Sequence, residues 1–131
     1  MGLFGKTKTK PAQPAQSKAM DYDQMIEFFG LPKGTSVRDD DCVFEFFIPS
    51  TTRLVMYENK RYQSVELLNT GKTVAVLMSG KHIGDVTPES HKEAIKALNT
   101  HGGIVAPAVL SPYRDSKKFY RIMCPDGNKT A

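Results

Sequence analysis

Short runs of aromatic and β-branched residues, each ended by turn-forming residues, recur along the chain from residue 43 onward. Such runs predict β-strands, and Ser79-Gly80 between two of them predicts a hairpin. The run at 73–78 is apolar on both faces, which is typical of a central strand. Pro107 cannot donate a ladder hydrogen bond, so we expect an edge strand or a bulge there. The predicted strands span residues 43–48, 54–57, 62–68, 73–78, 82–86, 104–110 and 118–123.

Residues 87–101 have the pattern of the longest helix in the chain. Thr87 is a favoured N-cap residue, and Pro88 is favoured at the first helical position. Apolar residues then recur at helical spacing as far as Leu98, and Gly102 is placed to end the helix. We therefore expect a well-capped helix over residues 87–101.

A shorter helix is predicted to begin at Asp21 and to end at Gly30. A helix of this length is not stable alone, so it must dock on another part of the protein. We expect Phe28 and Phe29 to anchor it. Its apolar side chains are Met25, Ile26, Phe28 and Phe29.

Together these elements predict an α+β fold that is mainly antiparallel β. We expect a small curled sheet or barrel of about six strands, with the helix at 87–101 and a short N-terminal helix. The chain has 131 residues, which suits one domain. We expect that domain to span residues 21–125, with disordered tails at 1–20 and 126–131. No apolar run is long enough to span a membrane.

The formal net charge of +4 equals the charge of residues 1–20, which contain four lysines and no acid. Residues 21–45 carry seven acids against two bases, and residues 46–131 carry twelve bases against seven acids. These two parts have net charges of −5 and +5, which predicts either mutual attraction or an interaction arm. Net charge alone therefore does not indicate nucleic-acid binding.

The cysteines Cys42 and Cys124 are too few for a disulfide scaffold, and their spacing matches no metal-binding motif. Residues 1–20 contain no apolar signal sequence. We therefore expect reduced thiols and a cytoplasmic protein that holds no metal and no cofactor.

The motifs with catalytic potential fail on their spacing. Residues 71–73 (Gly-Lys-Thr) resemble the end of a phosphate-binding loop, but Glu66 stands where the first glycine is required. The acidic run at 39–41 lacks the spacing of a calcium loop and is interpreted as solvated. His82 and Asp85 are an odd number of residues apart in a strand, so we expect them on opposite faces. The sequence therefore favours a protein that is not an enzyme.

Aromatic and basic side chains gather near the ends of predicted strands. Small β-barrels bind single-stranded nucleic acid through stacked aromatic residues beside a basic groove. The alternative interpretation is that the tyrosines pack at a sheet edge and the basic side chains are solvated. The candidate nucleic-acid-binding residues are Arg53, Tyr57, Arg61, Tyr62, Lys81 and His82.

Residues 74–76 (Val-Ala-Val) and 80–89 (Gly-Lys-His-Ile-Gly-Asp-Val-Thr-Pro-Glu) resemble the HIRAN domain family. That family has an Ala-Val-x-Val strand, a glycine-containing turn and a Pro-x-Glu helix start. The resemblance extends over residues 54–110. It implies a β-barrel and a non-catalytic module that binds single-stranded DNA or another polyanion.

A different class of function is a protein–protein interaction adaptor, of the type that phages or mobile elements encode, with no nucleic-acid binding. It would dock through the helix that carries Phe28 and Phe29, or through a sheet edge. An exposed apolar patch beside that helix would favour this alternative. A third class, a small hydrolase, requires a pocket with converging titratable groups.

Overall fold

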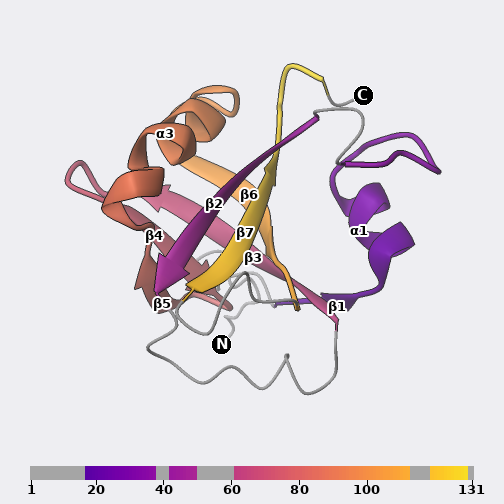
Figure 1. Cartoon of the computed structure of the whole chain (residues 1–131), viewed down its shortest axis with the longest axis horizontal. Coiled ribbons are helices and arrows are strands. Elements are labelled where there is room, and N and C mark those ends of the chain that lie inside the picture. Colours follow the sequence, from indigo (N-terminus) through magenta and orange to yellow (C-terminus); the bar gives the residue numbers. More distant parts are fainter. Residues whose placement is uncertain (1–16, 38–41, 50–60, 113–118, 130–131) are drawn as a thin grey trace, which may run out of the picture.

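The computed structural model describes residues 17–37, 42–49, 61–112 and 119–129, so the predicted strand at 54–57 lies outside the described residues. The fold is α+β with a curled, half-open antiparallel sheet, as the sequence predicts (Figure 1). The helical elements are α1 (Tyr22–Phe28), the 3-10 turn η1 (Pro88–Ser90) and α3 (His91–Asn99). The strands are β1 (Ala19–Met20), β2 (Val43–Pro49), β3 (Tyr62–Asn69), β4 (Val74–Met78), β5 (Lys81–Asp85), β6 (Val105–Leu110) and β7 (Phe119–Pro125).

The strands follow the order β2-β7-β6-β3-β4-β5, and β1 pairs with β3 beyond the end of β4. The sheet curls until its two edge strands, β2 and β5, approach each other. The loop after β5 joins them. The backbone N–H of Thr87 donates to the carbonyl of Phe47 (2.9 Å), and the backbone N–H of Phe47 donates to Oγ of Ser90 (3.3 Å). Part of the β2 edge is thus satisfied without a complete barrel.

Thr87 occupies the predicted N-cap position, and Pro88 follows it in the first turn, as predicted. The Thr87 side chain makes no capping hydrogen bond, and the chain enters α3 through the turn η1. The backbone N–H of Thr87 bonds to β2, whereas its carbonyl accepts from the N–H of Ser90 (2.9 Å) in η1. The end of the helix is as predicted, because Gly102 has a φ of 97° and the next N–H, of Gly103, donates to the carbonyl of Leu98 (2.8 Å).

The β4–β5 hairpin turns through Ser79 (φ 52°) and Gly80 (φ 79°), the left-handed pair that suits a two-residue turn. The register of β4 against β5 then shifts by one residue, which leaves Ile83 as an extra residue in β5. This bulge reverses the alternation of side chains. His82 and Asp85 therefore lie on the same face, and the prediction of opposite faces is wrong. Nε2 of His82 is 2.9 Å from Oδ1 of Asp85.

The inner face of the sheet, which points into the curl, packs against α3 and forms the main core (Figure 1). Ala94, Ala97 and Leu98 of α3 are fully buried there. Alternate residues of the strands face them, as the period of two requires. The largest of these are Phe46, Ile48, Leu67, Leu110 and Ile122.

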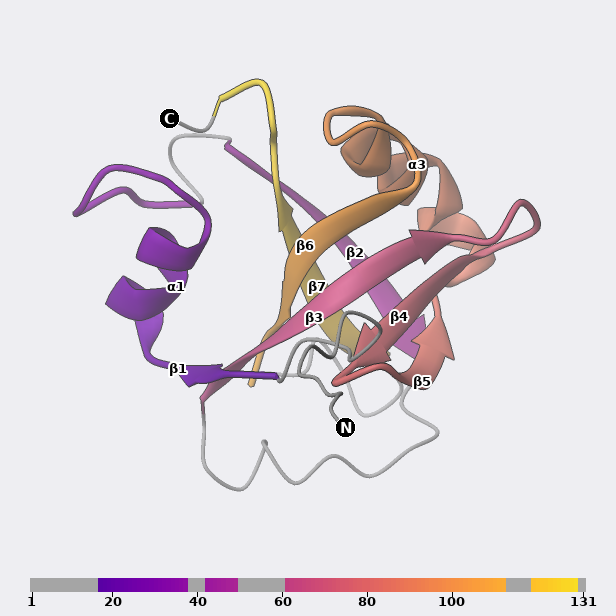
Figure 2. The same cartoon turned by 180° about the vertical axis from the view of Figure 1, so that it is seen from behind.

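The outer face of the sheet carries a second core beneath α1, on the side away from α3 (Figure 2). Phe29 is buried there and anchors the helix, as predicted. Phe28 is 37% exposed, and its prediction as an anchor is wrong. Consecutive helical residues point about 100° apart, so the face that buries Phe29 cannot also bury Phe28. The second core contains Met20, Met25, Ile26, Phe29, Leu31, Val109 and Met123.

The folded part begins before residue 21, because β1 pairs with β3. The backbone N–H of Ser64 donates to the carbonyl of Lys18 (2.9 Å), and the N–H of Lys18 donates to Oγ of Ser64 (2.8 Å). Disorder over residues 1–20 is thus wrong for residues 17–20. The edge of β3 beyond β4 offers unpaired backbone groups, and this segment satisfies them.

The folded part also extends past residue 125. The N–H of Gly127 donates to Oγ1 of Thr100 (2.9 Å), and Nε2–H of His101 donates to the carbonyl of Pro125 (2.7 Å). A Cβ on Gly127 would lie 2.2 Å from the carbonyl oxygen of Thr100, so only glycine fits. The prediction of a disordered tail at 126–131 is therefore wrong for 126–129, which dock on the end of α3.

Pro107 lies in β6, which is neither an edge strand nor bulged at this residue. β6 pairs with β3 throughout but with β7 only at Val109 and Leu110. The N–H of Asn69 donates to the carbonyl of Ile104 (2.8 Å), and this phase of the ladder turns the nitrogen of Pro107 away from β3. It faces the side where pairing with β7 has ended. No ladder hydrogen bond is lost there, so proline is tolerated.

Helix α1 depends on a capping box at its first turn. Oδ1 of Asp21 accepts from the N–H of Gln24 (2.8 Å), and Oε1 of Gln24 accepts from the N–H of Asp21 (2.9 Å). We expect Asp21→Ala to lower the free energy of unfolding by about 1 kcal/mol, measured by chemical denaturation. Asp23→Ala, which removes a neighbouring carboxylate outside the box, is the matched control. Equal losses in both variants would contradict a specific role for the box.

Candidate functional site

Arg61 and Tyr62, two of the predicted nucleic-acid-binding residues, lie at the start of β3 against the N-terminal segment. The Arg61 guanidinium donates to Oε1 of Gln24 (3.2 Å) and to the carbonyl of Ala19 (3.4 Å). The rings of Tyr62 and Tyr22 pack edge to face with centroids 6.2 Å apart. Both side chains therefore hold β1 and α1 against the sheet.

Lys81 and His82 lie elsewhere, exposed at the start of the edge strand β5. The Asp85 carboxylate lies within hydrogen-bond distance of the His82 ring, at 2.9 Å from Nε2. The structure brings Arg61 and Tyr62 together at the start of β3, and Lys81 and His82 together on β5, but β4 lies between these two strands. Lys81 pairs with Met78 of β4, next to the pair that Leu77 forms with Glu66 of β3. The remaining candidates, Arg53 and Tyr57, lie outside the described residues.

The described part of the chain contains no group of three or more His, Cys, Asp or Glu side chains that could hold a metal ion. Within the same residues, no helix is long and apolar enough to cross a membrane.

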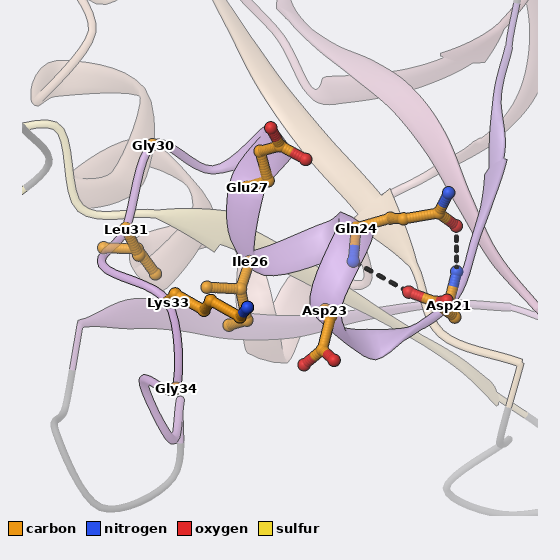
Figure 3. Close-up of a pocket in the computed structure, with 9 residues that line it drawn as sticks. All are labelled: Asp21, Asp23, Gln24, Ile26, Glu27, Gly30, Leu31, Lys33 and Gly34. Carbon is orange, nitrogen blue, oxygen red and sulfur yellow. Dashed lines mark hydrogen bonds between the residues drawn. The ribbon is translucent and has the colours of Figure 1, made fainter.

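A cavity of about 590 Å³ lies between α1 and the loop that follows it (Figure 3). Its titratable lining residues are Asp21, Asp23, Glu27 and Lys33. The Asp21 carboxylate is committed to the capping box, and the carboxylates of Asp23 and Glu27 point away from each other in Figure 3. These groups do not converge on one point, so this cavity gives the hydrolase hypothesis no support.

A second cavity, of about 350 Å³, lies between α1 and the outer face of the sheet. We call it the Phe28 groove. Phe28 forms its wall on α1, and Leu77, Val105 and Pro107 contribute apolar side chains from the sheet. Glu66 of β3 also lines it. The groove is therefore mainly apolar, with one carboxylate between the strands.

The strand register places the sheet residues of the groove side by side. Glu66 is directly opposite Leu77 on β4 and directly opposite Pro107 on β6. Val105 lies two residues before Pro107 in β6, on the same face of the sheet, and is 46% exposed. An apolar strip of the outer face thus continues beyond the part that α1 covers.

Of the groove residues, only Phe28 stands out in the sequence as a candidate for binding. Residues 105–108 (Val-Ala-Pro-Ala) are apolar on both faces of β6, although α3 buries only the inner one. That excess of apolar residues is a signal that the outer face has something to contact. No local sequence pattern indicates that Glu66 lines a groove, because its apolar neighbours, Leu77 and Pro107, come from other strands.

Comparison of the chain with protein-family models, with curated proteins and with solved structures found no match.

Both cysteines are buried, and neither forms a disulfide. Burial, together with the nearby negative charge of Asp126, raises the pKa of the Cys124 thiol from 9.0 to about 12. The folded protein therefore holds this thiol in its protonated form at neutral pH, where it is a poor nucleophile.

The raised pKa of Cys124 predicts a loss of stability at high pH. The unfolded thiol ionises near 9.0 and the folded one near 12, so ionisation favours the unfolded state between these values. We expect a loss of about 1 kcal/mol in unfolding free energy by about pH 10 from this group. Urea denaturation at neutral and alkaline pH measures it. Cys124→Ala should show a shallower decline, and an identical decline in both proteins would contradict the assignment.

Proposed function

We propose that this protein is a non-catalytic interaction module that docks on a partner protein through the Phe28 groove. Phe28 carries the proposal. It is an aromatic side chain at the end of α1, half-exposed beside a groove whose sheet wall is also apolar. Exposed apolar surface of this kind is typical of protein-binding sites, and aromatic side chains commonly supply most of the binding energy.

Binding of single-stranded DNA or another polyanion through a HIRAN-like surface is the second proposal. Exposed Lys81 and His82 support it. Arg61, in contrast, is bonded to β1 and α1, and Asp85 adjoins His82. The described candidates thus offer a weaker attraction for phosphate than the sequence suggests, and we prefer protein docking.

Selection of a phage-displayed peptide library on the 131-residue chain tests the preferred function. The selected peptides should bind Phe28→Gln about thirtyfold more weakly than wild type, because loss of an aromatic hot spot costs about 2 kcal/mol. Ile104→Gln is the matched control. Ile104 is 64% exposed and does not line the groove, so its loss should leave the affinity unchanged.

Fluorescence anisotropy with labelled single-stranded oligonucleotides, at two salt concentrations, is the competing arm. Salt-sensitive binding that Lys81→Glu weakens, together with no peptide binding that depends on Phe28, would support the polyanion proposal. That result would contradict docking through the groove.

A further inference from the structure

We propose that the Phe28 groove recognises an extended apolar segment of a partner protein that carries a lysine or arginine, and that Glu66 pairs with this cation. The inference rests on the proposed docking function and specifies the chemistry of the partner. It is carried by the position of Glu66 in the groove.

The Glu66 carboxylate is a charged group in apolar surroundings. Its direct neighbours on the two adjacent strands are Leu77 and Pro107, neither of which can donate a hydrogen bond from its side chain. Glu66 is half-buried, and its side chain has no hydrogen bond or ion pair within the part of the chain that the structure describes. An oppositely charged neighbour across the strands would stabilise such a carboxylate, and the direct neighbours of Glu66 carry no charge. Glu66 therefore has an unused binding capacity.

The other polar groups around the groove are already bonded to one another. The N–H of Ser17 donates to Oγ of Ser79 (2.8 Å), and the Ser17 hydroxyl donates to the carbonyl of Ser64. Oγ of Ser64 accepts from the backbone N–H of Lys18. The side chain of Lys18 is exposed at the rim of the groove and forms no ion pair with Glu66. Glu66, between the strands, and the Lys18 ammonium, at the exposed rim, are thus the charged groups of the groove that remain for a ligand. Only Glu66 lies where a docked segment would exclude water.

Docking of a purely apolar segment would cover the Glu66 carboxylate and strip it of water without compensation. A segment with a lysine or arginine supplies the opposite charge at the point where water is excluded. Adjacent apolar side chains of the segment can then contact Phe28, Leu77 and Val105. Because β3 is already paired with β6 on one side and with β1 and β4 on the other, the segment cannot add as a strand to β3 and reaches Glu66 through a side chain.

A panel of labelled synthetic peptides tests this directly on the 131-residue chain. The peptides share apolar flanks of valine and isoleucine and differ only in a central Lys, Arg, Gln or Glu. Fluorescence anisotropy should show the Lys and Arg peptides binding about tenfold more tightly than the Gln peptide, as expected for one pair with a half-buried charge. Glu66→Gln, which preserves the shape of the side chain, should abolish this preference.

Two further variants sharpen the result. Glu66→Lys should prefer the peptide with a central Glu, and Glu89→Gln, which removes an exposed carboxylate on η1, should behave like wild type. Peptides that depend on Phe28 but show no charge preference would overturn the role of Glu66 and leave the docking function standing. If neither the panel nor the library yields binding that depends on Phe28, both proposals fail.

Other occupants of the groove would also be detected. A dimer in sedimentation velocity that Phe28→Gln dissociates would make a second copy of the chain the occupant and would overturn a foreign partner. A gain of about tenfold in peptide affinity on combining Leu3→Ser with Phe4→Ser would assign the groove to residues 1–16 of the same chain, with the same consequence.

Discussion

The pairing of residues 17–20 with the first half of β3 is the interaction on which the position of α1 and the Phe28 groove depends. β4 covers the edge of β3 only from Glu66 to Asn69, and β1 covers the part that would otherwise be open. Because α1 follows β1 after a single residue, this pairing determines where the helix lies on the outer face. Arg61 adds a second tie by bonding to both elements. The position of the groove therefore follows from a short strand at the start of the fold.

The two faces of the sheet are covered by different helices, which differ in how they are stabilised. The inner face is filled by α3 and needs only the curl of the strands, whereas the outer face is covered by a helix of seven residues. Such a helix is unstable alone and takes its stability from burying Phe29 and its neighbours and from the capping box. The same orientation that buries Phe29 turns Phe28 toward the uncovered strip of β3, β4 and β6. A groove with one aromatic wall is the result.

Alternation and turn chemistry were enough to predict most strands, both helices and the curled antiparallel class, because these signals are local. The pairing of β1, the bulge at Ile83 and the use of Thr87 by β2 all depend on which segments meet in space, and no local pattern reports that. The roles of Arg61 and Glu66 were likewise not predictable from local patterns. Arg61 is of a residue type that often binds ligands, but here its guanidinium bonds to Gln24 of α1. Glu66 is a candidate for binding only because its cross-strand neighbours are Leu77 and Pro107.

In this structure α1 is held against the outer face of the sheet and so forms one wall of the Phe28 groove. Nuclear Overhauser effects between methyl groups, measured on the 131-residue chain in solution, test it most directly. We expect cross-peaks that link Met25 and Ile26 of α1 to Val109 and Met123 of the sheet. Cross-peaks confined to α1, with none to the sheet, would mean that the helix is not docked and that it forms no wall of the groove.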